Sequence, residues 1–318
     1  MTLRLASRGS TLALWQARHV ESLMRALHPE LDVVIDVLHT TGDRITDVPL
    51  AMIGDRGLFT KEVDNAVLDG RAHVAVHSYK DVPTQIPPGL VLGAVLERED
   101  PRDVFLPAPG RTSALRDLPA GARVGTSSLR RRALLLANRS DIVVEDLRGN
   151  LDTRLQKLSE GHFDGIILAL AGLRRFGRED LAGELLDAPH WLPAAGQGAL
   201  AIVARADDEQ TLARMRPLDH AATRATTDAE RSFLARLEGG CQIPIGALGG
   251  IQGSTLTLHG LVASLDGTTI VRGKVSADFG DARGAGELLA ADLSARGATD
   301  VLRAIRDANE TAPQPPAP

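Results

Sequence analysis

The hydrophobic positions along the chain follow two alternating periods, and this alternation predicts strands and helices in turn. Apolar residues return every three or four positions between Leu12 and Leu27, which is typical of an amphipathic helix. The β-branched run from Leu31 to Leu38 predicts a strand directly after it. Further helices are expected over 58–68, 129–138, 151–158 and 171–176, and further strands over 3–7, 74–76, 91–96, 122–125, 142–145, 165–170 and 200–204. Strands that alternate with helices indicate parallel or mixed α/β sheets.

The pattern changes after residue 220, where a long helix over 221–237 is followed by strands with no helix between them. Strand-like runs near 243–250, 255–264 and 268–277 predict an antiparallel sheet, and helices are expected near 286–296 and 298–308. The fold class is therefore α/β with three domains, two with mixed sheets and a third that is α+β. The strand at 200–204 is expected to return to the first sheet. The predicted domains are 1–96 plus 196–216, 97–195 and 217–311, followed by a disordered tail at 312–318.

Composition narrows the class of protein. The chain has 318 residues and a single cysteine, which excludes a disulfide framework and a zinc site built mainly from thiolates. No apolar run approaches the ~20 residues of a membrane span, and no signal peptide is recognisable, so we expect a cytoplasmic protein. The net charge of −5 and the 3% aromatic content argue against nucleic-acid and membrane partners. The histidines show no spacing typical of metal ligands, so no metal site is expected.

Basic residues gather where the predicted strands end. Only four of the 36 lysines and arginines are lysines; GC-rich codon usage accounts for the excess of arginine but not for its placement. In open α/β sheets ligands bind beyond the carboxyl ends of strands, beside helix N-termini that favour anions. Any one of these cations alone is also explained as a solvated surface residue. As a set they predict a cleft for a polycarboxylate, because no phosphate-binding glycine loop is present. The set is Arg8, Lys80, Arg130, Arg131, Arg148, Arg154, Arg174 and Arg175.

Two other residues are candidates for chemistry. Asp81 follows a buried strand and precedes Pro83, so it is either a turn-forming residue or a carboxylate that stabilises a developing cation. Cys241 follows two glycines, so it is either a small buried residue or a thiol with space for an attached group. Residues 44–57 have no clear period and contain hinge-forming residues, which predicts a loop suited to act as a lid.

Seven motifs resemble, in order, those of the porphobilinogen deaminase family, also called the hydroxymethylbilane synthase family. They include HSYKDVP at 77–83, GTSSLRR at 125–131 and LEGGCQIPIG at 237–246. The others lie at 8–17, 57–62, 97–103 and 147–150. The resemblance extends from Leu3 to Asn309, and although each motif alone is moderate evidence, the ordered set is specific.

The resemblance implies a fold and a reaction. The first two domains would be like type II periplasmic binding proteins, with the active cleft between them. The enzyme, a transferase, would join four porphobilinogen molecules head to tail with loss of ammonia, giving hydroxymethylbilane for haem biosynthesis. A dipyrromethane cofactor, made from substrate and joined through a thioether to Cys241, would prime the chain. Asp81 would hold pyrrole N–H groups and stabilise the cation formed as ammonia leaves. A monomer that passes its product to uroporphyrinogen-III synthase is also implied.

The resemblance also implies which residues bind the acidic side chains of substrate and cofactor. These are Arg8, Ser78, Lys80, Thr126, Ser128, Arg130, Arg131, Arg148, Arg154, Arg175 and Gln197, with Arg56, Phe59 and Lys61 in the lid region. The chain departs from the commoner family residues at Arg56, Tyr79 and Arg132. A non-catalytic polycarboxylate-binding module with a solute-binding-protein fold is the alternative. Cys241 discriminates between the two, because a binding protein has no use for a covalent primer.

Overall fold

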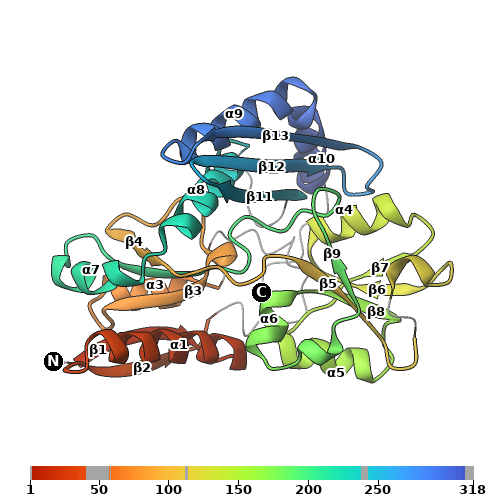
Figure 1. Cartoon of the computed structure of the whole chain (residues 1–318). Helices are drawn as coiled ribbons and strands as arrows, with labels where there is room; N and C mark the ends of the chain where they lie inside the picture. Colours follow the sequence, from red (N-terminus) through yellow and green to blue (C-terminus); the bar gives the residue numbers. More distant parts are fainter. Residues whose placement is uncertain (1, 41–56, 58, 112–113, 238–242, 312–318) are drawn as a thin grey trace.

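The computed structural model describes residues 2–40, 57, 59–111, 114–237 and 243–311, and side chains as far as residue 308. Figure 1 shows two sheets side by side, built from the N-terminal two thirds of the chain, and a third sheet above both. In the described part of the chain, no helix combines the length and the apolar composition that crossing a membrane requires.

The first sheet is mixed and has the strand order β2-β1-β3-β10-β4. β1 is parallel to β2 and β3, whereas β10 is antiparallel to both of its neighbours. Leu5 and Ala6 alternate across β1 and therefore join hydrophobic clusters on opposite faces of the sheet. The strands are β1 (Thr2–Arg8), β2 (Asp32–Leu38), β3 (Val74–Ser78), β4 (Leu90–Val95) and β10 (Leu200–Arg205), and the helices are α1 (Thr11–Leu27), α3 (Lys61–Leu68) and α7 (Glu209–Met215).

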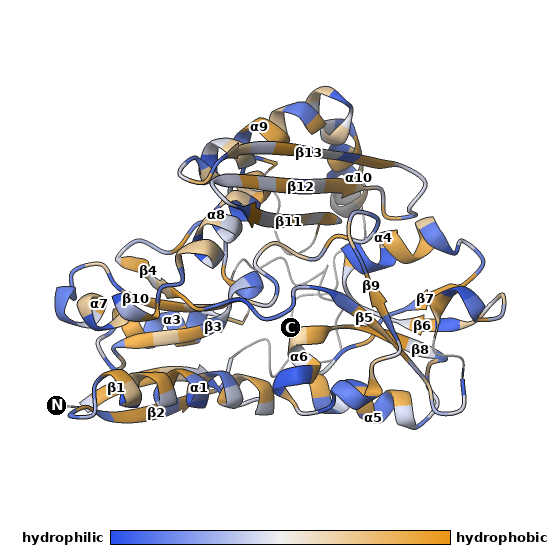
Figure 2. Cartoon of the chain, in the orientation of Figure 1, coloured by the Kyte–Doolittle hydropathy of each residue, from blue (hydrophilic) through white to orange (hydrophobic). Residues whose placement is uncertain are grey.

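The second sheet has the equivalent order β7-β6-β8-β5-β9, with β5 antiparallel to β8 and β9. One face packs on α4 and the other on α5 and α6, so the sheet has a hydrophobic cluster on each face. Figure 2 shows β5 as largely hydrophobic. The strands are β5 (Asp103–Pro107), β6 (Arg123–Gly125), β7 (Val143–Glu145), β8 (Gly165–Ala169) and β9 (Glu184–Leu186), and the helices are α4 (Leu129–Asn138), α5 (Leu151–Ser159) and α6 (Leu170–Arg175).

The third sheet is antiparallel, in the order β11-β12-β13. Phe233 of α8 is the largest side chain in its core, which lies between the sheet and its helices. Leu261 and Ala263 of β12 point to the opposite face and join the cluster of α4 in the second unit. The strands are β11 (Ile245–Gln252), β12 (Thr255–Ala263) and β13 (Ile270–Asp278), and the helices are α8 (Ala221–Arg236), α9 (Ala282–Ala295) and α10 (Ala298–Thr311).

These sheets confirm the predicted fold class, two mixed sheets and one antiparallel sheet. β10 pairs with β3 and β4, so the strand predicted at 200–204 does return to the first sheet. The sequence analysis missed β5, β9 and α7. β9 has three residues and α7 seven, which is too short for a clear period. The short 3-10 helices η2 (Tyr79–Asp81), η3 (Leu115–Asp117), η4 (Glu179–Leu181) and η5 (Arg216–Leu218) complete the described elements.

Candidate active site

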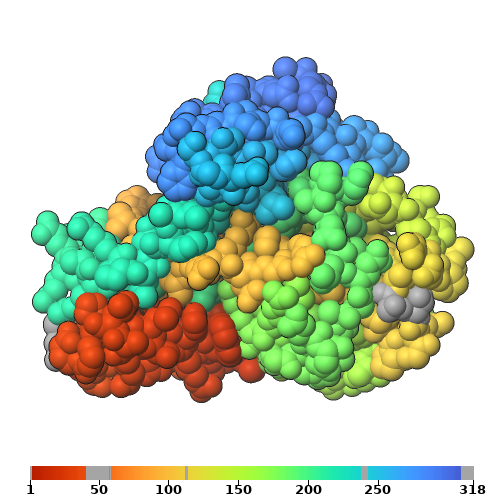
Figure 3. All heavy atoms as spheres, in the orientation of Figure 1, coloured from red at the N-terminus to blue at the C-terminus, as the bar shows by residue number. Residues whose placement is uncertain are grey.

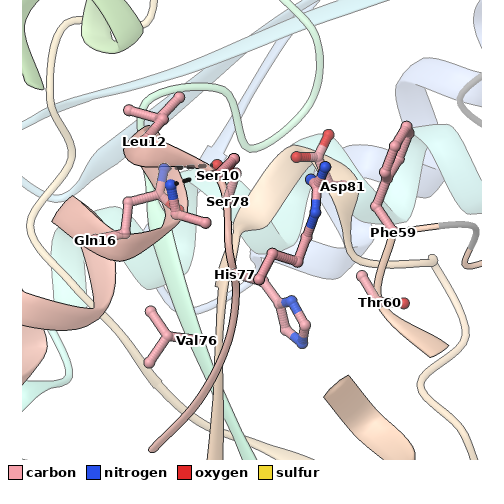
Figure 4. Close-up of a pocket in the computed structure, with 11 residues that line it drawn as sticks. Ser10, Leu12, Gln16, Phe59, Thr60, Val76, His77, Ser78 and Asp81 are labelled. Atoms are coloured by element: carbon pink, nitrogen blue, oxygen red, sulfur yellow. Dashed lines mark hydrogen bonds between the residues drawn. The ribbon is translucent and has the colours of Figure 1, made fainter. Parts of the chain in front are cut away.

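A pocket lies where the carboxyl ends of β1 and β3 meet at one edge of the first sheet. The two strands are parallel, so Arg8 at the end of β1 and Ser78 at the end of β3 come to the same edge. The 3-10 helix η2 follows β3 at once and adds Lys80 and Asp81. The pocket is lined by Arg8, Ser10, Phe59, His77, Ser78 and Asp81, among others (Figure 4).

Local contacts fix this side of the pocket. The Ser10 hydroxyl accepts a hydrogen bond from the Ala13 backbone N–H at 3.3 Å and so begins α1 beside the pocket. The Gln16 side-chain amide donates to Ser78 Oγ at 2.8 Å, which links α1 to the end of β3 (Figure 4). The Arg8 guanidinium lies over the Phe59 ring, 4.5 Å from its centroid. Phe59, which is expected in the lid region, therefore packs against Arg8, which is expected to bind substrate.

The second sheet contributes a buried carboxylate, Asp103, at the start of β5. Its oxygens accept hydrogen bonds from Arg130 Nη1 at 2.7 Å, Arg131 Nη2 at 2.7 Å and Trp191 Nε1 at 2.8 Å. Burial opposes ionisation, but the two guanidiniums prevail and hold the pKa of Asp103 far below its usual range. The Arg130 Nη1 also donates to the Leu192 carbonyl, so Arg130 builds the wall of the site.

Gln197 connects the two sheets. Its amide donates to Asp103 Oδ1 at 2.8 Å and to the Pro101 carbonyl at 2.7 Å. Its carbonyl oxygen accepts from Lys80 Nζ at 3.3 Å and lies 3.5 Å from Arg131 Nη2. Gln197 lies on the segment that returns from the second sheet to the first, so a cation of each sheet is held at the junction between them.

Three cations near the junction of the first two sheets have lowered pKa values. Burial, with the nearby Arg131, lowers the pKa of Lys80 to about 8. Burial and Arg131 also lower the pKa of Arg154 to about 10, and burial lowers the pKa of Arg175 to about 10. Burial disfavours the charged form of these groups, and a bound anion favours it. A ligand with several carboxylates would therefore suit these cations.

The remaining basic residues differ in their surroundings. Arg148 and Asp81 both act on the charge of Arg154, which places the three groups in one electrostatic environment. The Arg154 Nε donates to the Gly149 carbonyl at 2.8 Å, and Arg175 donates to the Gly198 carbonyl. Arg174 instead pairs with Glu99 and Glu179, so its expected place in the cleft is wrong. These two carboxylates hold the Arg174 guanidinium in ion pairs.

The N-terminus of α4 supplies the two hydroxyls predicted on this side. Ser128 accepts from the Arg131 backbone N–H at 3.4 Å and caps the helix. Thr126 is buried and accepts from the Ser128 N–H at 3.2 Å. Lys61 is exposed at the start of α3. Arg56 and Cys241, and with them most of the predicted lid, lie outside the described residues.

The first and second units also touch at the rim of the site. Thr11 Oγ1 on α1 donates to Asp152 on α5 at 3.0 Å, and the Arg175 guanidinium lies 5.8 Å from the centroid of the Trp15 ring. Figure 3 shows this contact between the N-terminal part of the chain and the unit that carries α5 and α6.

Sequence reasoning missed the residues that support the cleft from behind, namely Asp103, Trp191, Arg98, Glu230 and Arg231. Asp103 was part of a quoted motif, at 97–103, but was not singled out. It begins the apolar run DVFLP, and a carboxylate at the start of such a run is the signal that would have marked it, because a buried carboxylate needs cationic partners. Which arginines are these partners does not follow from the local sequence.

Comparison with known proteins gives a consistent result. Residues 3–213 match the family model "Porphobilinogen deaminase, dipyromethane cofactor binding domain", and residues 225–295 match "Porphobilinogen deaminase, C-terminal domain". A porphobilinogen deaminase of Nitratidesulfovibrio vulgaris is 50% identical over 313 residues, covering 97% of this chain and 98% of that protein. One of Syntrophomonas wolfei is 48% identical over 300 residues, covering 94% and 97%.

Solved structures include more distant matches. The BenM effector-binding domain with benzoate has a TM-score of 0.42 and 15% identity, covering 68% of this chain and 90% of that one. An ancestral arginine-binding protein bound to arginine has a TM-score of 0.39 and 13% identity, with coverage of 68% and 90%. The family models together match most of the chain, and both curated relatives match nearly its whole length. The chain belongs to the porphobilinogen deaminase family.

Proposed function

We propose that Asp81 is the catalytic residue of this chain and that the basic residues of the cleft hold the acidic side chains of porphobilinogen and its oligomers. The family activity makes the chain an enzyme, a hydroxymethylbilane synthase, rather than a binding module. It joins porphobilinogen molecules head to tail and releases ammonia at each step. The observation that carries the residue assignment is the place of Asp81 in the pocket, where its charge acts on Lys80 and Arg154.

The dipyrromethane group of the family fits the residues that are present. Its carboxylates would form ion pairs with Lys80, Arg131 and Arg154, whose charges act on one another. When bound, the group supplies the pyrrole end to which the first substrate molecule is joined. We propose Cys241 as its attachment point, through a thioether at Sγ. Cys241 lies five residues beyond the end of α8.

Asp81 would act through its charge. As the C–N bond of porphobilinogen breaks and ammonia leaves, the substrate becomes a cation whose charge spreads over the pyrrole ring. A carboxylate at the pyrrole N–H accepts a hydrogen bond and stabilises that cation electrostatically. Asp81 then keeps its hydrogen bond to the pyrrole N–H of the substrate while the new carbon–carbon bond forms. The pyrrole carbon that attacks the substrate loses its hydrogen to solvent as a proton.

Binding would depend on ion pairs between the basic residues and the carboxylates of the ligand. Each pyrrole unit bears two carboxylates, so a growing chain is a polyanion. A hydrogen bond to a charged group contributes ~1.5–3 kcal/mol, so several of them hold an oligomer through repeated cycles. The hydroxyls of Ser78, Thr126 and Ser128 add neutral donors at the same sheet edges.

The assignment is tested by counting products in a single reaction. The loaded enzyme, mixed with excess porphobilinogen, should release four ammonia molecules per hydroxymethylbilane, and acid quenching should trap protein species that differ by one pyrrole unit. Consumption of porphobilinogen without ammonia release would reject the reaction. A normal yield from an Asp81→Asn variant would instead reject only the role of Asp81.

Lys80 gives the site a pH dependence. Its pKa is about 8 in the protein without a bound anion, against a usual value of 10.5. A bound carboxylate restores the charged form, so binding takes up a proton between these two values and the affinity falls as the pH rises through this window, by up to about tenfold per pH unit. We expect the Kd of the Cys241→Ala protein for porphobilinogen, measured by calorimetry, to rise between pH 8 and 9.5. The added Lys80→Arg substitution should flatten this rise, and an equal slope in both proteins would contradict the role of Lys80.

We further propose that the enzyme is a cytoplasmic monomer that passes its product to uroporphyrinogen-III synthase, and that its domains have the bounds 1–96 plus 196–216, 97–195 and 217–311. Resemblance to the family supports the first three statements. The strand pairing of the three sheets supports the domain bounds. Sedimentation velocity of the purified protein tests the oligomeric state.

A further inference from the structure

The third domain reaches the catalytic turn through one buried arginine, Arg231 of α8. Its guanidinium lies over the ring of Tyr79, 4.5 Å from the centroid. Nη1 donates to the Val82 carbonyl at 2.9 Å and lies 3.5 Å from the Tyr79 carbonyl, and Nη2 donates to the Pro83 carbonyl. These hydrogen-bond acceptors are all backbone carbonyls of the turn that follows β3.

The carbonyls lie on both sides of Asp81. Tyr79 begins the 3-10 helix that Asp81 ends, and Val82 and Pro83 come directly after it. The Tyr79 carbonyl accepts the Val82 N–H at 3.2 Å within the turn, and backbone carbonyls at the end of a helical turn carry partial negative charge, so a cation stabilises them. A planar guanidinium can span several such carbonyls, whereas an ammonium group cannot do so with the same geometry. Arg231 therefore fixes the backbone that carries the Asp81 carboxylate.

Tyr79 forms the platform for this arginine. It is among the largest fully buried side chains, and Arg231 itself is 8% exposed, so the cation–π contact is shielded from water. The Tyr79 N–H donates to the Ala199 carbonyl at 3.0 Å, which ties the same turn to β10.

The preceding residue on α8, Glu230, anchors the helix to the connection between the first two sheets. Its carboxylate is fully buried and accepts from Arg98 Nη1 at 2.6 Å, from the Gly196 N–H at 2.7 Å and from the Gly249 N–H at 2.8 Å. Gly196 has a φ of +74°, and a Cβ atom at this position would lie 3.3 Å from atoms of Tyr79 and from the Lys80 backbone N. Two consecutive residues of α8, which Figure 1 shows beside β11, thus hold the connection and the catalytic turn in one arrangement.

We propose that Arg231 is a positioning residue that sets the location of the Asp81 carboxylate, and that the third domain controls the catalytic turn through it. The inference rests on the proposed role of Asp81. It adds that the helix leading to Cys241 also locates the group that acts on the substrate. A misplacement of about 1 Å in a reacting group lowers the rate ~10²-fold, so loss of the Arg231 contacts is expected to act mainly on kcat.

The test uses Arg231→Met, which keeps much of the side-chain volume and removes every donor. Arg236→Met is the control, because it removes the same charge from an exposed position at the end of the same helix. We expect Arg231→Met to lower kcat per loaded molecule by ~10–10²-fold with KM changed less than about threefold, and Arg236→Met to leave both unchanged. Loading is measured by intact mass. A lower melting temperature with unchanged kcat would overturn the proposal.

A spectroscopic measurement reports on the turn without turnover. Tyr79 is the only tyrosine of the chain, so incorporation of 3-fluorotyrosine gives one ¹⁹F resonance, two residues from Asp81. Arg231→Met should shift or broaden this resonance, while Arg236→Met should not. An unchanged resonance in Arg231→Met would show that the turn keeps its place without the arginine. If Arg231→Met does not fold, Arg231→Lys replaces it, with an intermediate loss of kcat expected and no loss contradicting the proposal.

A double-mutant cycle with Asp81→Glu tests whether Arg231 acts through Asp81. If it does, Arg231→Met lowers kcat less in the Asp81→Glu protein than in the original protein, because the carboxylate is already displaced. Multiplicative effects would overturn the proposal. Asp81→Asn alone separates the two hypotheses: a mild effect rejects the role of Asp81, whereas a severe effect beside a silent Arg231→Met rejects only the positioning role.

Discussion

Asp81→Asn is expected to lower kcat by more than the ~10²–10⁴-fold that one general acid–base group contributes. The substitution keeps the shape of the side chain and removes its charge, which is needed each time ammonia leaves. Asp81 lines the pocket at the end of η2, where few structural contacts are lost, so the melting temperature should change little. The measurement is ammonia release under substrate saturation, corrected for the loaded fraction.

Asp117→Asn is the matched control for Asp81→Asn. Asp117 also ends a 3-10 helix, η3, but it is exposed and lies away from the pocket. We expect it to leave kcat unchanged. A loss of only a few fold in Asp81→Asn would return Asp81 to the alternative interpretation, a turn-forming residue before Pro83.

Arg131→Leu is expected to prevent the protein from acquiring its attached group. Arg131 donates from Nε and Nη2 to Asp103 and from Nη1 to the Ile167 carbonyl, and all of these groups are buried. Removal of one partner of a buried ion pair lowers the free energy of unfolding by ~3–5 kcal/mol, so the variant should also be less stable. Intact mass of the purified variant, and its melting temperature, measure both effects.

Arg148→Leu separates the effect of a lost positive charge on elongation from the effect of a lost buried ion pair on stability. Arg148 is half-buried, whereas Arg131 is buried, so the loss of Arg148 should lower stability less than the loss of Arg131 while elongation stalls. Stalled species should appear as extra bands on native gels after incubation with porphobilinogen. Arg174→Leu, in which an arginine paired with Glu99 and Glu179 is lost, is the control and should turn over normally. Normal turnover in both Arg131→Leu and Arg148→Leu would remove the cationic cleft from the mechanism.

Much of the fold could be predicted because its signals are local. The helical period of apolar residues in α1 directly follows its cap residue Ser10. The sequence of β3 is a short apolar run before a polar turn, which predicts a buried strand. β5 and β9 were missed because their strand character depends on pairing with β8 and with each other, far away along the chain. The return of β10 to the first sheet was predicted, and its pairing with β3 and β4 confirms it.

The site could be predicted only in part for the same reason. Arg8, Ser78 and Asp81 meet because parallel strands end at one edge, which follows from the strand–helix order. The preference of Arg130 for Asp103 does not follow from local sequence, because the two are 27 residues apart and meet only when α4 packs on the sheet. The contact of Arg231 with Tyr79 spans two domains and has no sequence signal at all.

The attachment of two pyrrole units to Cys241 is tested most directly by the intact mass of the purified, active protein under denaturing conditions. The mass should exceed that of the bare chain by two porphobilinogen molecules less two ammonia molecules, and this difference should be absent from Cys241→Ala. A fully active protein with the mass of the bare chain would contradict the anchored primer, and with it the roles given to the basic residues that surround Asp81.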